Sequence, residues 1–255
     1  MILAIDVGNT NIVLGCIEDG NILNIVRLHT DAKQTGAEYA IKLKQVLDLY
    51  GMDVSRLTGA IYSSVVPPVN RAMLSAVKAV TGLECMVVGP GIKTGLNLRI
   101  DDPGTLAGDL LVGGVAAMSC YGAPAIVMDL GTATTITVVD RDGAFRGGAI
   151  LPGVKLGMAA LAAGTSLLPD ISITPPKKVI GSNTVDCMRS GAVYATAAAI
   201  DGMIDRMEAE LGYPCTHIAT GGLAKAIVAC CRHAIVCDDD LLLKGLWVLW
   251  QKNRK

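Results

Sequence analysis

The chain repeats one short pattern of residues near its start and again 123 residues later. In each copy an apolar run ends in an aspartate, Asp6 or Asp129, and glycine and small polar residues follow it. A second apolar run comes next, and an Asp-Gly pair closes each copy, Asp19-Gly20 and Asp142-Gly143. Apolar runs bounded by turn residues predict strands, and Asp-Gly between two of them predicts a hairpin. The sequence therefore predicts a fold that is built twice from the same unit.

The turn after each aspartate has the composition of a phosphate-binding turn. Gly8 and Gly131 would let the backbone approach a phosphate closely, because glycine has no side chain. A carboxylate at the end of a buried strand is costly unless it has a partner, and a magnesium or monovalent ion is such a partner. The alternative is that Asp6 and Asp129 only hydrogen-bond their own turns, and the presence of two copies in register weakens it. The expected phosphate-side residues also include hydroxyl and amide side chains, namely Asn9, Thr10, Asn11, Thr132, Thr134 and Thr135.

A third carboxylate, Asp109, lies in the first turn of a helix predicted from 105 to 120. An acid at this position ordinarily stabilises the helix dipole by ~0.3–1 kcal/mol. Its place between the two turns, just after a loop rich in Gly, Pro and Asp at 89–104, favours a catalytic role. A kinase needs a carboxylate to orient and deprotonate the attacking hydroxyl, and we expect Asp109 to do this. Asp101 and Asp102 precede Pro103 and are predicted to be turn residues.

Gly221 and Gly222 follow a predicted strand at 218–220 and precede a helix. They would allow close approach of a nucleotide base or ribose, but a plain strand-to-helix turn explains them equally well. The three histidines are scattered, so no metal site is assigned to them. Residues 238–240, three aspartates in a row, are predicted to form a solvated helix N-terminus.

Composition excludes several classes of protein. About half of the 255 residues are apolar and the formal net charge is -1, so neither disorder nor nucleic-acid binding is expected. The uncharged run from Leu110 to Met128 is broken by Gly122-Ala123-Pro124, so no membrane span is expected. The N-terminus enters a strand directly, and the eight cysteines match no zinc framework. We expect a cytoplasmic protein with reduced, buried thiols.

The order of predicted elements is typical of an α/β fold with mixed sheets and flanking helices. Two domains are expected, at 1–118 and 119–255. The predicted strands cover 2–6, 11–17, 21–28, 60–66, 85–88, 125–129, 134–140, 144–150 and 218–220. The predicted helices cover 36–50, 69–81, 105–120, 154–164 and one long helix at 184–211, which Asn183 or Thr184 could cap.

Taken in order, the motifs of the chain resemble those of the type III pantothenate kinases over nearly its full length. They are the two aspartate turns, Ser63 to Pro68, Gly91 to Leu96, Gly147 to Gly153, Asn183-Thr184, and Thr220 to Leu223. The resemblance implies the duplicated fold of the actin-like ATPases and sugar kinases. In that fold two ribonuclease H-like domains flank a cleft. A homodimer is also implied.

The resemblance further implies ATP with Mg²⁺ as phosphoryl donor, and a monovalent cation, K⁺ or NH₄⁺, near Asp129. Asp6 would serve the magnesium side, Asp109 would be the general base, and Thr184 would contact pantothenate. Two residues depart from the pattern. Where the family has Gly-x-Asp-Arg, this chain has Ala107-Gly108-Asp109-Leu110, and Ile100 stands where the family tends to have Tyr. Both departures fall on the pantothenate side.

Three functions follow as hypotheses. The first is ATP-dependent phosphorylation of pantothenate, the first step of coenzyme A synthesis. The second is a divergent kinase of the same fold that acts on another small hydroxylated acceptor, which the residues Ile100 and Leu110 motivate. The third is a non-catalytic nucleotide-binding regulator, which the retention of Asp6, Asp109 and Asp129 argues against.

Overall fold

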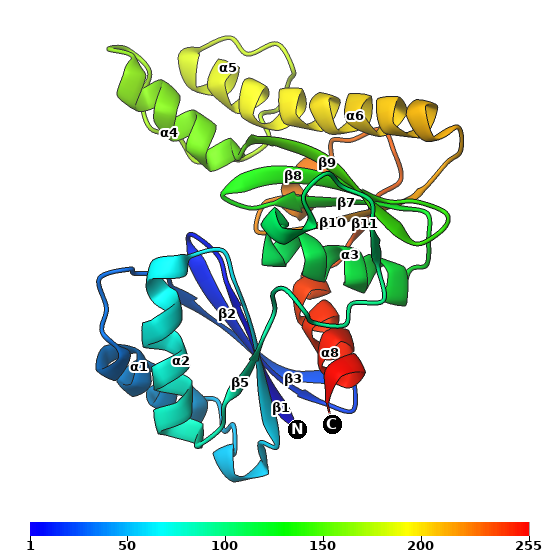
Figure 1. The fold of residues 1–255 in the computed structure, drawn as a ribbon. Helices are drawn as coiled ribbons and strands as arrows, with labels where there is room; N and C mark the ends of the chain where they lie inside the picture. The colour runs from blue at the N-terminus through cyan, green and yellow to red at the C-terminus, as the bar shows by residue number, and fades with distance from the viewer. Residues whose placement is uncertain (255) are drawn as a thin grey trace. The chain divides into compact units, whose positions relative to one another are not determined.

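The two predicted copies of the repeat form two sheets of the same topology. The computed structural model describes residues 1–254 and divides into two compact units (Figure 1). The first unit comprises Met1–Gly95, Asp102–Ser119 and the segment that begins at Leu241. The second comprises Leu96–Asp101 and Cys120–Asp240. The predicted domain boundary between 118 and 119 stays a prediction.

The first unit holds a sheet of order β3-β2-β1-β4-β5. Strands β1, β2 and β3 are antiparallel neighbours, whereas β4 and β5 run parallel to β1. The strands are β1 Ile2–Val7, β2 Asn11–Glu18, β3 Asn21–His29, β4 Gly59–Ser64 and β5 Cys85–Val87. The helices of this unit are α1 Gly36–Leu49, α2 Pro67–Thr81, α3 Gly108–Cys120 and α8 Leu241–Asn253, with 3₁₀ turns at Val54–Arg56 and Pro103–Thr105.

The second unit repeats this order as β9-β8-β7-β10-β11, with β6 added beside β9. Its pairings are again antiparallel for β7, β8 and β9 and parallel for β10 and β11. This agreement confirms the predicted duplication and the mixed sheets. The strands are β6 Asn97–Leu98, β7 Ala125–Leu130, β8 Ala133–Val139, β9 Ala144–Pro152, β10 Thr216–Thr220 and β11 Val236–Cys237. The helical segments are α4 Val154–Gly164, α5 Thr184–Ser190, a π-helix at Gly191–Ala195, α6 Thr196–Leu211 and α7 Ala224–Val228.

Both predicted Asp-Gly hairpins are present, but their turns differ. Asp19 and Gly20 have φ of 49° and 85°, the two positive values that a two-residue type I′ turn requires. In the second copy only Gly143 has positive φ, and its amide donates to Asp140 O at 2.9 Å. The second hairpin is therefore longer.

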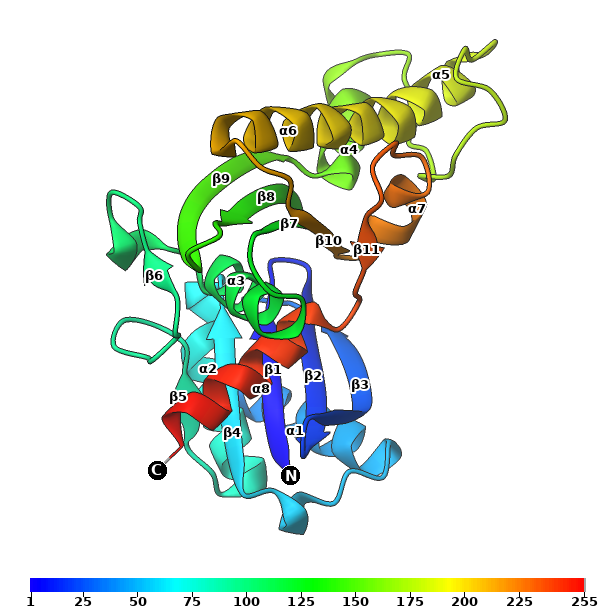
Figure 2. The ribbon, with the colours of Figure 1, turned by 90° about the vertical axis from the view of Figure 1, so that its right-hand side faces the viewer.

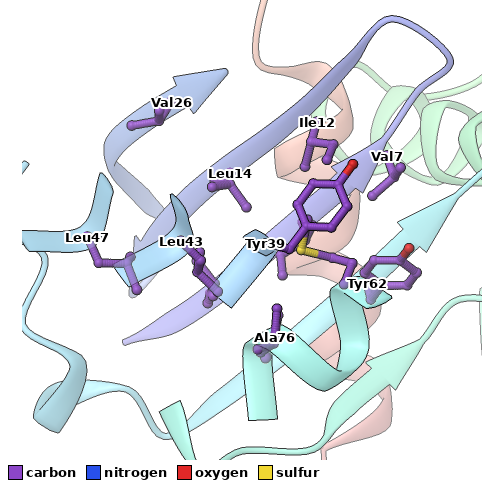
Figure 3. Close-up of a cluster of buried hydrophobic side chains, with 14 of the residues drawn as sticks. Val7, Ile12, Leu14, Val26, Tyr39, Leu43, Leu47, Tyr62 and Ala76 are labelled. Atoms are coloured by element: carbon purple, nitrogen blue, oxygen red, sulfur yellow. The ribbon is translucent and has the colours of Figure 1, made fainter. Parts of the chain in front are cut away.

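One face of the first sheet packs against α1 and α2 around buried aromatic and aliphatic side chains (Figure 3). Tyr39 of α1 and Tyr62 of β4 are fully buried, and their hydroxyls donate to Asp31 O at 2.8 Å and to Asn70 Oδ1 at 3.0 Å. Both aromatic rings thus add apolar contact area without leaving a polar atom unpaired. Since Ile5 and Val7 point into this cluster, Asp6 points to the opposite face.

The opposite face of the first sheet is covered by α8, which crosses it in front of β1 and β4 (Figure 2). Two glycines allow the approach: a Cβ on Gly59 would lie 2.0 Å from the ring of Trp250, and one on Gly15 would lie 2.8 Å from Leu243. Helix α3 packs against α8 just as closely, because a Cβ on Gly245 would meet Val112 O at 2.4 Å. The sequence pattern did not predict the bounds of α8.

In the second unit, residues of β7, β8 and β10 pack against the helix that the sequence predicted as one piece, 184–211. A five-residue π-helix, Gly191–Ala195, interrupts it. A π turn inserts an extra residue into a helix. Val193 within the π-helix and Ile200 in α6 both belong to the core. Asn183 caps the helix by accepting from Asp186 N at 2.9 Å, as predicted.

Several other predictions need correction. The loop at 89–104 contains the short strand β6, and the helix predicted from 105 begins at Gly108. Asp238 is buried and accepts from the hydroxyl of Tyr121 at 2.8 Å, so it is not part of a solvated helix start. Cys16 is buried as expected, whereas Cys120 and Cys187 are exposed. No helix in the described part of the chain has both the length and the apolar character to cross a membrane.

Replacing Gly59 by Ala should destabilise the first unit, because the new methyl would overlap the Trp250 ring. Overpacking of this kind costs ~1–3 kcal/mol, and urea unfolding of the variant measures it. Gly89→Ala is the matched control, since a Cβ there has no atom within 4 Å. A Gly59→Ala protein as stable as the control would contradict the packing of α8 on β4.

Candidate functional site

The first aspartate turn is tightly held. Asp6 is 8% exposed at the end of β1, and Gly8 N donates to Asn11 O at 2.9 Å across the turn. A Cβ on Gly8 would lie 3.3 Å from that same oxygen, so glycine suits the position. Thr30, which the sequence analysis did not single out, fixes the turn by donating its hydroxyl to Gly8 O at 2.7 Å. The side chains of Asn9, Thr10 and Asn11 are exposed.

The second aspartate turn is one residue shorter than the first. Asp6 pairs across its hairpin with Val13, whereas Asp129 pairs with Thr135. Gly131 N donates to Ala133 O at 3.1 Å, and Asp129 is half-buried. Gly131 and Thr132 are exposed. The two turns are therefore alike in composition but not in backbone.

Thr134 and Thr135 lie on opposite faces of the second sheet. Thr135 is the register partner of Asp129, so its side chain is on the carboxylate's face. Thr134 pairs with Leu130, a core residue, and its buried Oγ1 has no hydrogen-bond partner among the described residues. The geometry thus places Thr135 nearer to the carboxylate than Thr134.

Glycine 221 lies directly against Asp129. Its φ of +96° favours glycine, and a Cβ there would lie 2.5 Å from Asp129 Oδ1. The backbone conformation and the contact with Asp129 are each sufficient to require glycine at position 221, whether or not a nucleotide binds there. A Cβ on Gly222 would meet no atom within 4 Å, so backbone packing does not explain the second glycine.

Each unit places a hydroxyl residue beside its aspartate on the neighbouring parallel strand. Asp6 of β1 is in register with Ser63 of β4, and Asp129 of β7 is in register with Thr220 of β10. Register partners on adjacent strands point to the same face, with the strands about 4.8 Å apart. The duplication therefore extends to a carboxylate-hydroxyl pair that the sequence alone did not reveal.

Asp109 lies in the first turn of α3, in the first unit. Its Oδ1 accepts from Leu110 N at 2.7 Å. Burial raises the pKa of the Asp109 carboxyl above its usual range, although hydrogen bonds from the amides of Leu110 and Asp109 oppose the shift. A carboxylate that holds a proton more strongly than usual is suited to accept one from an alcohol.

Helix α3 starts close to the pair formed by Asp6 and Ser63. A Cβ on Gly108 would lie 3.1 Å from Ser63 Oγ and 3.9 Å from the backbone of Ser64. The first unit thus gathers Asp6, Ser63 and the residue preceding Asp109. Ala107 O accepts the amide of Leu111 at 3.1 Å, which starts the helix, and Leu110 is half-buried.

The remaining acceptor-side residues of the sequence analysis belong to the second unit. Ile100 follows β6, and its Cγ2 lies 3.6 Å from the position of a Cβ on Gly147. Thr184 is exposed at the first residue of α5.

The oxygen-rich surroundings of the two aspartates suit hard cations better than transition metals. Among residues 1–254 there is no group of three or more His, Cys, Asp and Glu side chains that could hold a metal by itself. Asp6, with a buried hydroxyl on the next strand, fits a magnesium ion that keeps most of its waters. Asp129, beside Gly221 and the turn backbone, fits an ion held by carboxylate and carbonyl oxygens.

Solved structures share this fold. A conserved putative Baf family transcriptional activator from Campylobacter jejuni aligns with a TM-score of 0.62 at 17% identity, over 99% of this chain and 98% of that one. A ROK family protein from Streptococcus pneumoniae aligns with a TM-score of 0.54 at 12% identity, over 99% of both chains. At such identities the likeness concerns the fold alone, and it supports the predicted actin-like and sugar kinase architecture.

Sequence comparison is more specific. The family model described as type III pantothenate kinase matches residues 2–206. A type III pantothenate kinase from Halalkalibacterium halodurans is 42% identical over 253 residues, which cover 99% of this chain and 100% of the relative. The chain therefore belongs to the type III pantothenate kinase family.

Proposed function

We propose that the protein transfers the γ-phosphate of ATP to the primary hydroxyl of pantothenate and so forms 4′-phosphopantothenate, the first step of coenzyme A synthesis. Membership in the family supports the reaction, and the half-buried carboxylate of Asp109 at the start of α3, with its raised pKa, is the observation that carries the mechanism. An assay that couples ADP formation to a signal, with ATP, magnesium, potassium and pantothenate, tests it directly.

In the proposed reaction the acceptor oxygen bonds to the γ-phosphorus as the bond to the β–γ bridging oxygen breaks. Asp109 accepts the proton of the hydroxyl and orients its lone pair. The turn residues Gly8 to Asn11 and Gly131 to Thr132 bind phosphate oxygens through backbone and side-chain donors. Gly222, whose lack of a side chain is not required by packing, is proposed to leave room for the nucleotide together with Gly221.

Asp6 is proposed to hold a magnesium ion, and Asp129 a monovalent cation such as K⁺ or NH₄⁺. Bound cations supply neutralising charge for the phosphates of ATP. The contribution of the protein is to present a carboxylate at the end of a rigid strand in each unit, where it cannot move away from the bound group. We also propose that the protein is cytoplasmic, because its proposed substrate ATP is abundant there.

The acceptor side is proposed to include Ala107 to Leu110, Ile100 and Thr184. Ile100 and Leu110 give this chain an apolar character where the family pattern has Tyr and Arg. This observation favours a second candidate, a kinase of the same fold with another small hydroxylated acceptor. A panel of such acceptors separates the two, since efficient phosphorylation of pantothenate alone excludes the second.

Asp109→Asn should abolish turnover while leaving the folded protein as stable as wild type or more stable at neutral pH. Because burial raises the pKa of Asp109, the stability linked to this group is present below the unfolded pKa and is lost as pH rises through the folded one. The gain in melting temperature from Asn should therefore be larger at pH 7 than at pH 4. Full turnover by the variant would remove Asp109 from the mechanism, and a lower melting temperature at neutral pH would contradict the burial argument.

Leu110→Arg should lower the Michaelis constant for pantothenate with little change in kcat. An added charge-assisted hydrogen bond to the pantothenate carboxylate is worth ~1.5–3 kcal/mol, about ten- to a hundredfold in affinity. Steady-state kinetics measures both constants, and a selective fall in the Michaelis constant identifies a uniform binding contribution. An unchanged constant would mean that another residue has taken over the role of the family arginine.

A homodimer is also proposed, and the surface of α4 supports it. Apart from Lys155 this helix carries no charged side chain, yet only Val154 among its residues is buried. Leu156 and Leu161 are 53% and 42% exposed, and Leu167 and Ile180 are almost fully exposed in the segment that follows. Apolar surface of this extent usually marks a contact with another protein, and a second copy of the chain is the proposed partner.

Replacing both Leu156 and Leu161 by Asp should convert the dimer to a monomer, because each buried carboxylate would be unpaired in the interface. Light scattering after size exclusion measures the mass. Leu49→Asp is the control, since Leu49 is 79% exposed on α1 of the first unit and should leave the mass unchanged. A double variant that stays dimeric would place the interface elsewhere.

A further inference from the structure

The hydroxyl of Ser63 is an unusual buried group. Ser63 is 0% exposed, and its Oγ has no hydrogen-bond partner among residues 1–254. Burying a hydroxyl without a partner is unfavourable, and most buried polar side-chain atoms are paired. An unpaired hydroxyl of this kind suggests that Ser63 forms a hydrogen bond in another state of the protein, such as the substrate-bound one.

The nearest structural feature is the N-terminus of α3. The Cβ position of Gly108, the first residue of α3, lies only 3.1 Å from Ser63 Oγ. The first amides of any helix have no acceptor within the helix. An unpaired hydroxyl oxygen therefore lies beside a set of amides that need acceptors.

In the structure without substrates, the carboxylate of Asp109 accepts hydrogen bonds from these amides. Its Oδ1 accepts from Leu110 N at 2.7 Å, and hydrogen bonds from the amides of both Leu110 and Asp109 act on its titration. If Asp109 turns toward an acceptor hydroxyl, its Oδ1 moves away from Leu110 N and this bond is weakened or lost.

The other unit shows that the placement of Ser63 is part of the repeat. Thr220 occupies the equivalent position, in register with Asp129 as Ser63 is with Asp6. In that unit the residue after the hydroxyl is Gly221, which lies against Asp129. In the first unit the residue after the hydroxyl is Ser64, and Gly108 at the start of α3 lies beside Ser63. The surroundings of the two hydroxyls therefore differ.

We propose that Ser63 is a positioning residue for Asp109. When substrates bind and Asp109 turns toward the acceptor hydroxyl, Ser63 Oγ accepts a hydrogen bond from the first-turn amides of α3 in its place. This replacement of one acceptor by another keeps the N-terminus of α3 capped while the Asp109 carboxylate accepts the proton of the substrate. Gly108 permits it, because any side chain there would stand between the hydroxyl and the helix. The inference rests on the proposed function of Asp109 as the base.

Ser63→Ala tests this exchange. Loss of one hydrogen bond should lower kcat about three- to tenfold, with the Michaelis constant for ATP unchanged. The melting temperature of the substrate-free protein should be unchanged or higher, because the variant removes an unpaired hydroxyl. Hydrogen exchange of the Asp109 and Leu110 amides should stay slow when ADP and pantothenate bind to wild type, because Ser63 replaces the carboxylate as acceptor, and should become faster on binding in Ser63→Ala.

Ser64→Ala is the matched control. Its hydroxyl accepts from Val66 N at 3.0 Å, so its loss should lower the melting temperature while kcat and the exchange of the α3 amides stay as in wild type. Equal kcat in Ser63→Ala and wild type, or Asp109 and Leu110 amides whose exchange on ligand binding is the same in both proteins, would overturn the inference. If these amides stay protected with pantothenate bound in wild type but not in Ser63→Ala, and pantothenate is not phosphorylated, the proposed reaction fails and the role of Ser63 in capping stands.

Discussion

The register between the central strand of each sheet and its parallel neighbour is the constraint on which the site depends. Asp6 and Asp129 can lie at the ends of buried strands only because those strands are paired on both sides. Full pairing satisfies the backbone of these strands, so polar chemistry at their ends depends on the side chains and on the turns that follow. A shift of one residue in either strand would turn the carboxylate into the apolar core on the other face. Register therefore fixes the side of the sheet on which chemistry takes place.

Glycines allow the helices α8 and α3 to pack closely on the sheet, and this packing brings Asp109 into the same unit of the fold as Asp6. Gly15 and Gly59 let α8 lie on the face to which Asp6 points, and Gly245 lets α3 pack on α8. The position of α3, the helix that carries Asp109, thus depends on two successive packing contacts, β-sheet to α8 and α8 to α3. Each contact is close because a glycine without a side chain lies in it. Interiors are close-packed, so such contacts leave an element little freedom to shift. Within the first unit, the position of the proposed base follows from the packing of the last helix of the chain.

Much of this architecture could be predicted from the sequence, because it depends on local patterns. Alternating apolar runs, Asp-Gly pairs and helix caps such as Asn183 all act between residues close in the chain. The features that escaped prediction depend on distant residues. Nothing near Ser63 in sequence indicates that β4 pairs with β1 in a register that brings it beside Asp6. Likewise the π turn at Gly191–Ala195 shifts the helical period by one residue, and an apolar pattern with several alanines does not resolve such a shift.

The one-residue difference between the two turns gives a physical reason why duplicated aspartates need not have the same task. The first turn carries one residue more, and Thr30 fixes its backbone. Asp6 itself is nearly buried, and a dication that keeps its own water shell would bring water molecules to a place that bulk water reaches poorly. Asp129 is more open, and Gly221 keeps carbon atoms away from its carboxylate. An ion at Asp129 could then take its other ligands from backbone carbonyls of the shorter turn. Such neutral oxygens compensate a single charge better than a double one, so we expect the two sites to differ in the charge of the ion that they hold.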